Sequence, residues 1–149
     1  MGNRRKARET SLQLLYEIDL GSKSSTEVIG AFRADAERLV LDGADAALSS
    51  DDITEFTSQI TEGVWSNVHE IDRLIEMHST HWKISRMALV DRNILRMAVF
   101  ELLYCADIPA SVTINEAIEI AKKFGTTESS RFINGVLDRI LREQRATSA

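Results

Sequence analysis

The chain has little of the residues that interrupt or cross-link a fold. Cysteine and proline each occur once among 149 residues, as Cys105 and Pro109, and glycine occurs seven times. A single cysteine excludes a disulfide framework and is typical of the reducing cytoplasm. No apolar run has membrane-spanning length, and basic residues followed at once by Glu9 and Gln13 do not form a signal peptide. We therefore expect a cytoplasmic protein without a membrane segment.

The usual sequence signatures of catalysis are missing as well. The scattered glycines form no phosphate-binding loop, no Gly-x-Ser-x-Gly elbow and no Gly-x-Gly-x-x-Gly fingerprint. His78 and His81, with His69 nine residues before His78, hint at a metal site, but no carboxylate lies at a ligand-like spacing. We interpret these histidines as helix-end and core residues, and we predict no enzyme activity, no cofactor and no metal.

Helical periodicity dominates what remains. Hydrophobic residues make up 44% of the chain and charged residues 28%, as in an ordinary globular domain. No segment alternates apolar and polar residues with a period of two, whereas apolar residues recur three or four apart. This spacing predicts helices over about residues 4–20, 25–42, 53–78, 87–106, 113–124 and 127–144. We expect an all-α fold, one domain with two small antiparallel helical subdomains, about 1–80 and 81–149, packed together.

Local signals set several of these helix boundaries. Residues 43–52 are predicted to connect the second helix with a long third one. The fourth predicted helix is apolar on nearly every side, which marks it as the central buried helix. Thr113 and Glu116 have the spacing of a capping box, and Gly125 is expected to end the helix that this box starts.

The net charge of −5 conceals an uneven distribution. Residues 1–26 carry five bases and three acids, residues 27–76 three bases and twelve acids, and residues 77–149 ten bases and eight acids. The acids of the middle segment are most simply a solvated face. Both ends of the chain are basic, so a local patch that binds a polyanion is compatible with the acidic total.

The first predicted helix combines bases with an aromatic residue in the stretch RRKARETSLQLLY, residues 4–16. Its apolar arc consists of Leu12, Leu14, Leu15 and Ile18. Tyr16 lies at the edge of this arc, on the side of Arg5 and Glu9. Periodicity alone leaves two readings open: a half-buried core tyrosine, or a stacking platform for single-stranded nucleic acid flanked by guanidinium groups.

Two features of the central helix stand out. Asp91 falls on the side of Ile94 and Ala98, where an apolar residue is expected. Its simplest role is that of a first-turn acid at the positive helix terminus. Arg92 and Arg96 lie one turn apart on a separate stripe, which is usually the solvent strip of a buried helix.

The last predicted helix has an aromatic residue away from its main apolar face. Phe132 lies near Glu128 and Gly135, and the glycine would let another backbone approach closely. A protein contact and a satellite core contact are both compatible with this position.

Four stretches together resemble the NusB family of bacterial transcription antitermination factors: RRKARETSLQLLY, ILRMAVFELLY, IPASVTINEAIEIAKKFG and RFINGVLDRI. The resemblance implies an all-helical fold and no catalysis. It implies a pairing with NusE, a ribosomal protein of the small subunit, and binding of this pair to the boxA RNA of nascent ribosomal RNA transcripts. With NusA, NusG and RNA polymerase, the complex would keep transcription of ribosomal RNA operons from terminating early.

The resemblance also implies roles for individual residues. RNA contacts of the family match Arg4, Arg5, Lys6, Arg8 and Tyr16, and basic positions near the same surface match Arg96 and Lys122. Positions that face NusE, or lie beside that region, match Asp91, Glu128 and Phe132. Lys6 stands where many members have arginine, which keeps the charge but loses the planar fork. The acidic second helix matches the family poorly.

Two alternative functions are also considered. An RNA-targeting domain of a ribosomal RNA methyltransferase would need a downstream cofactor-binding domain, and this chain ends at Ala149. A helical module that binds only protein would leave the basic N-terminus without a role. RNA affinity measured with and without residues 1–8 distinguishes this protein-binding module from an antitermination factor.

Overall fold

The computed structural model describes residues 2–41, 51–80 and 82–148, and the described residues form helices without any strand. The predicted all-α fold is confirmed. The chain divides into two compact units, Met1–Ser66 and Asn67–Ala149. None of the described helices is both long and apolar enough to cross a membrane.

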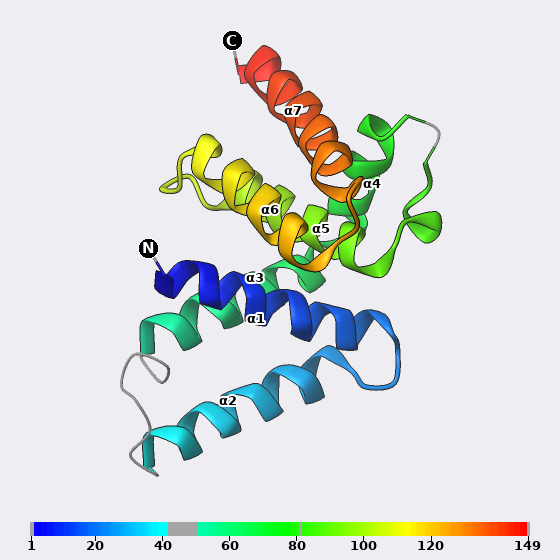
Figure 1. Cartoon of the computed structure of the whole chain (residues 1–149). Helices are drawn as coiled ribbons and strands as arrows, with labels where there is room; N and C mark the ends of the chain where they lie inside the picture. The colour runs from blue at the N-terminus through cyan, green and yellow to red at the C-terminus, as the bar shows by residue number, and fades with distance from the viewer. Residues whose placement is uncertain (1, 42–50, 81, 149) are drawn as a thin grey trace. The chain divides into compact units, whose positions relative to one another are not determined.

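Three helices build the N-terminal unit: α1 (Gly2–Asp19), α2 (Ser25–Leu41) and α3 (Asp51–Ser66) (Figure 1). α1 packs along α3, and α2 contacts both. Leu15 of α1 and Ile60 and Val64 of α3 are fully buried in this unit. The first two helices match the predicted ranges, whereas residues 43–50 of the predicted connector 43–52 lie outside the described residues.

Small hydroxyl side chains line the contact between α1 and α3. Ser11 Oγ donates to the carbonyl oxygen of Ala7 at 2.9 Å and lies 3.3 Å from that of Thr57. Thr57 Oγ1 donates to the carbonyl oxygen of Ile53 at 2.7 Å. Backbone carbonyls satisfy the hydroxyls of Ser11 and Thr57, although both are buried where the two helices meet. α1 is therefore held along its length by α3.

The long third helix predicted over residues 53–78 is wrong. α3 ends at Ser66, and α4 (Val68–His78) begins after Asn67, whose φ of −117° and ψ of 18° leave the helical region. The apolar residues Val64, Val68 and Ile71 keep a helical spacing across this break, so periodicity could not detect it. Since α4 packs on helices of the C-terminal unit, the two units divide here and not near residue 80.

The C-terminal unit is built around α5. It comprises α4, the 3₁₀-helix η1 (Ile84–Arg86), α5 (Leu89–Tyr104), α6 (Ala110–Phe124) and α7 (Ser129–Ser148). Every residue of α5 from Asn93 to Glu101 is buried, and α5 contacts α4, α6 and α7. The prediction of a central buried helix is confirmed.

The capping box predicted at Thr113 is also wrong. α6 begins earlier, at Ala110, directly after Pro109, which has no N–H to leave unsatisfied at a helix start. Thr113 is buried inside the helix, and its Oγ1 donates to Glu101 Oε1 at 3.0 Å. This hydroxyl is used by a buried carboxylate of α5, which needs a donor, and not by the helix terminus.

The end of α6 at Gly125 is confirmed. The φ of Gly125 is −94°, which any residue can adopt, so the backbone conformation does not require glycine. The reason is space: a Cβ atom on Gly125 would clash with the hydroxyl of Ser129 and lie 2.9 Å from the carbonyl oxygen of Ala121. Gly125 thus allows the tight passage from α6 to α7.

Candidate nucleic-acid and protein interfaces

The first turns of α1 present a cationic helix end. Arg4, Arg5 and Lys6 are exposed, and we refer to these three residues as the basic arm. Successive residues of a helix point about 100° apart, so the three charges spread around the helix end. Arg4 contacts α3, because its guanidinium carbon lies 4.4 Å from the ring centre of Phe56.

Arg8 does not belong to this exposed group. It is only 3% exposed, and its guanidinium carbon lies 5.3 Å from the ring centre of the buried Phe56. Arg8 lies one turn after Arg4 on the side of α1 that faces α3, so its guanidinium is less accessible to RNA than those of the exposed residues. Arg8 therefore packs against Phe56, the same ring that Arg4 contacts.

Tyr16 lies near the other end of α1 and is 37% exposed, between the buried Leu15 and the exposed Glu17. More than a third of its surface is accessible, so a base could stack on the ring. The helical rise places Tyr16 about 16 Å along the axis from Arg5. A strand that contacts both residues must therefore run along α1.

The structure brings Asp91, Glu128 and Phe132 together. They line one hollow of about 350 Å³ in the C-terminal unit, which we call the Phe132 pocket, and the other lining residues are Trp82, Arg86, Met87 and Ala88. Phe132 is partly exposed, and the rings of Trp82 and Phe132 meet edge to face, with centres 6.5 Å apart at an angle of 66°. Trp82 itself is 53% exposed. Two aromatic side chains and two carboxylates thus share one accessible hollow.

Hydrogen bonds hold the segment that carries Trp82. Ser79 Oγ donates to the carbonyl oxygen of Trp82 at 2.8 Å, and the N–H of Ile84 donates to Glu76 Oε1 at 3.2 Å. Arg92 Nη1 donates to the carbonyl oxygen of Ile84 at 3.2 Å. These bonds tie the backbone of Trp82 and Ile84 to α4 and α5, so the backbone that carries the indole has a defined position.

A side chain, and not the closely approaching backbone that the sequence predicts, lies nearest to Gly135. The nearest atoms to a Cβ built on Gly135 are the guanidinium nitrogens of Arg139, at 3.8 and 3.9 Å. Arg139 also donates through Nε to the carbonyl oxygen of His78 at 2.7 Å. The side chain of Arg139 therefore lies over the glycine, and the candidate protein contact is the Phe132 pocket.

Arg96 is not a surface residue. It is 5% exposed, and its Nε and Nη2 lie 2.8 and 2.9 Å from the two carboxylate oxygens of Asp72. Its Nη1 donates to Asn93 Oδ1 at 3.0 Å. The placement of Arg96 on a solvent strip is wrong, because this bidentate pair joins α5 to α4 inside the unit. Lys122, by contrast, is exposed on α6, 3.4 Å from Glu119 Oε1.

His78 is the last residue of α4, as its interpretation as a helix-end histidine requires. Its Nδ1 lies 2.8 Å from the carbonyl oxygen of Leu74, and its Nε2 contacts the carboxylate of Glu143. His69 is exposed, and His81 lies outside the described residues. In the ranges that the structure describes, no three His, Cys, Asp or Glu side chains are grouped so that they could hold a metal ion.

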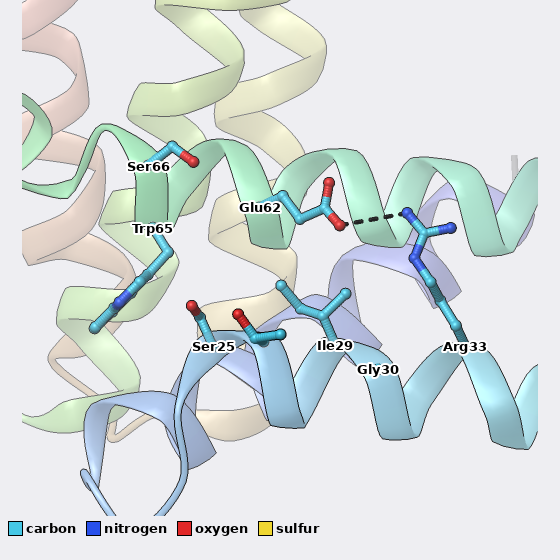
Figure 2. Close-up of a pocket in the computed structure, with 8 residues that line it drawn as sticks. Ser25, Ile29, Gly30, Arg33, Glu62, Trp65 and Ser66 are labelled. Carbon is cyan, nitrogen blue, oxygen red and sulfur yellow. Dashed lines mark hydrogen bonds and ion pairs between the residues drawn. The ribbon is translucent and has the colours of Figure 1, made fainter.

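The N-terminal unit has a hollow of its own, of about 480 Å³, between α2 and α3. Figure 2 shows Trp65 at one end of this hollow and the ion pair of Arg33 and Glu62 at the other, with Ile29 and Gly30 between them. Arg33 Nη2 and Glu62 Oε1 are 3.4 Å apart. None of the residues predicted to bind RNA or protein lines this hollow.

Comparison with known proteins decides the family. The NusB family model matches residues 5–142. The transcription antitermination protein NusB of Myxococcus xanthus is 43% identical over 140 residues, which cover 94% of this chain and 95% of that protein. The chain belongs to the NusB family. A second NusB protein, from Geotalea daltonii, is 47% identical over 144 residues and covers 94% of each chain.

Solved NusB structures have the same fold. NusB of T. maritima superposes with a TM-score of 0.73 at 37% identity, covering 94% of this chain and 91% of that one. A chain from the crystal structure of the antitermination factors NusB and NusE in complex with dsRNA superposes with a TM-score of 0.77 at 26% identity, covering 96% and 98%. The NusB-family fold thus extends over nearly the whole chain.

Sequence reasoning missed several residues that build these surfaces of the NusB-family chain. Phe56 is one of the buried apolar residues of α3, and periodicity does not show that arginines stack on it. Trp82 and Arg86 lie between the predicted helices 53–78 and 87–106, where periodicity gives no signal, and Met87 precedes α5 although the prediction placed it at the start of that helix. A signal for Arg8 did exist, since Arg8, Ser11 and Leu15 share one helix face.

Proposed function

We propose that this protein acts in transcription antitermination by binding, together with NusE, the boxA RNA of nascent ribosomal RNA transcripts. With NusA, NusG and RNA polymerase, it keeps transcription of ribosomal RNA operons processive. Membership of the NusB family supports this proposal, as does the similarity to a chain crystallised with NusE and double-stranded RNA. The relatives that match the chain are named transcription antitermination proteins, which favours this function over the targeting domain of a methyltransferase.

The basic arm carries the RNA part of the proposal. Arg4, Arg5 and Lys6 are exposed at the start of a helix that packs along α3, so their charges keep a fixed place on the folded unit. Phosphate contacts of Lys and Arg release counterions and supply much of the affinity for RNA. We assign phosphate contacts to the arm and to Lys122, and base stacking to Tyr16. Arg8 and Arg96 act inside the fold and position other residues.

The Phe132 pocket carries the protein part. Its aromatic pair offers a place for an apolar side chain of NusE, and aromatic residues in such pockets often dominate the binding energy. Asp91 and Glu128 favour a basic residue of NusE beside that apolar one, since complementary charges fix the register of a complex. Trp82 joins the three residues that the sequence had singled out.

Transcription in a purified system tests the proposed function. A template carries a ribosomal RNA leader with boxA ahead of a terminator, and RNA polymerase, NusA, NusG and NusE are present throughout. Adding this protein should raise the fraction of transcripts that pass the terminator, and scrambling boxA should abolish the increase. Equal readthrough with and without the protein on the boxA template would refute the proposal.

A further inference from the structure

An aromatic residue lies exposed at the end of α6. The buried face of this helix includes Ala117, Ile120 and Ala121, and Phe124 continues the same stripe one turn further. Phe124 is nevertheless 45% exposed, because it is the last residue of α6 and extends past the core. It lines neither of the two hollows described above. The predicted RNA and NusE contacts leave this ring without a role.

One cation lies beside this ring, and a second one precedes it on the same helix. Lys123 Nζ lies 5.2 Å from the ring centre of Phe124, which is within cation–π range. Lys122 precedes it, and its ammonium group is exposed, with Glu119 Oε1 at 3.4 Å. An exposed ion pair of this length is weak and screened by salt, so it leaves Lys122 able to exchange Glu119 for a phosphate.

The backbone directly after Phe124 is well held. The N–H of Gly125 donates to the carbonyl oxygen of Ala121 at 2.8 Å, and the N–H of Thr126 donates to Ser129 Oγ at 2.9 Å. The ring therefore stands on a fixed helix end and not on a loose loop. A fixed platform loses little conformational entropy when a ligand stacks on it.

We propose that Phe124 is a stacking platform for one unpaired RNA base, with the ammonium groups of Lys122 and Lys123 on the adjacent phosphates. The combination of an exposed aromatic face with nearby cations is how single-stranded nucleic acid is bound. A protein partner is the weaker match, because aromatic anchors of protein interfaces enter pockets and lysine is depleted there. The inference rests on the proposed function and extends its RNA contacts to the end of α6.

The test measures the affinity of the full-length protein for a fluorescent single-stranded boxA RNA. Phe124→Ala and Phe124→Leu should both weaken binding, by roughly 5- to 100-fold, since leucine keeps the apolar contact but offers no flat ring. Phe124→Trp should bind at least as well as the wild type. Val112→Ala is the matched control, because Val112 is an exposed apolar residue of the same helix and should not affect RNA binding.

RNAs with a single abasic nucleotide at each position locate the stacked base. One position should weaken binding to the wild type but have no further effect on Phe124→Ala, because the lost base and the lost ring belong to one interaction. Wild-type affinity in Phe124→Leu would overturn the inference. A loss of NusE binding with unchanged RNA affinity would also overturn it, in favour of a protein contact.

Failure of this inference differs from failure of the proposed function. If the wild type binds boxA RNA and loses affinity without its basic arm, but Phe124→Ala has no effect, only the stacking role of Phe124 is refuted. If the wild type does not bind boxA RNA even with NusE present, the proposed function itself fails. Melting temperatures of the Phe124 variants should stay close to that of the wild type, since the ring is half exposed.

Discussion

Removing the basic arm should change how RNA affinity depends on salt. The variant is Arg4→Ala, Arg5→Ala and Lys6→Ala together, with Arg8 kept because it is buried against Phe56. For single-stranded RNA, each lost phosphate contact reduces the slope of log affinity against log salt by about 0.7. Loss of all three contacts therefore reduces the slope by about 2.

This slope translates into a difference that is easily measured. Between 50 and 200 mM salt, wild-type affinity should fall about 20-fold more than that of the triple variant. Fluorescence anisotropy with a labelled boxA RNA over this range gives both slopes. The variant should fold normally, because it loses only exposed side chains and the contact of Arg4 with Phe56, which is of a kind worth about 0.5–1 kcal/mol.

Matched single variants distinguish a specific effect of the basic arm on RNA binding from an effect of the net charge of the protein. Lys6→Ala should reduce the salt slope, whereas Lys23→Ala, in the turn after α1, removes an equal charge and should leave the slope unchanged. Arg8→Ala should mainly lower the melting temperature, since its guanidinium is buried. Equal slopes for the wild type and the triple variant would refute the reasoning.

Three further outcomes are expected. Tyr16→Ala should weaken RNA binding by about 1–3 kcal/mol and Tyr16→Phe much less; equal losses would show that the ring face is not what binds. Phe132→Ala should weaken NusE binding by about 2 kcal/mol with RNA affinity of the isolated protein and melting temperature nearly unchanged; a large drop in melting temperature would make Phe132 a core residue. Asp72→Ala should lower the free energy of unfolding by about 3 kcal/mol, because it leaves the guanidinium of Arg96 buried without the carboxylate of Asp72. Urea denaturation measures this loss, and unchanged stability would contradict the expectation.

Helix positions were the most predictable part of the fold. Apolar residues three or four apart place α1, α2, α5 and α7 close to their observed ranges, since a buried helix face needs this spacing. The break at Asn67 was invisible, because the spacing continues across it while the two halves belong to different units. The start of α6 was misplaced because the hydroxyl of Thr113 serves Glu101, twelve residues earlier in the chain.

The candidate sites were predictable only in part, and partners distant in the sequence explain the errors. Arg96 is buried because Asp72 of α4 neutralises it, and no local pattern shows that pairing. The sequence and its resemblance to the NusB family singled out Asp91, Glu128 and Phe132, which do share one hollow. Trp82 was missed, because hydrogen bonds and not periodicity set its position.

Equilibrium binding to boxA RNA, with and without NusE, tests the central claim most directly. A labelled boxA RNA and a scrambled RNA of the same composition are each titrated with the full-length protein, alone and with equimolar NusE. The account predicts that boxA is bound more tightly than the scrambled RNA and that NusE strengthens binding to boxA, an effect that the pocket variant Phe132→Ala reduces. Equal affinity for both RNAs, unaffected by NusE, would contradict it.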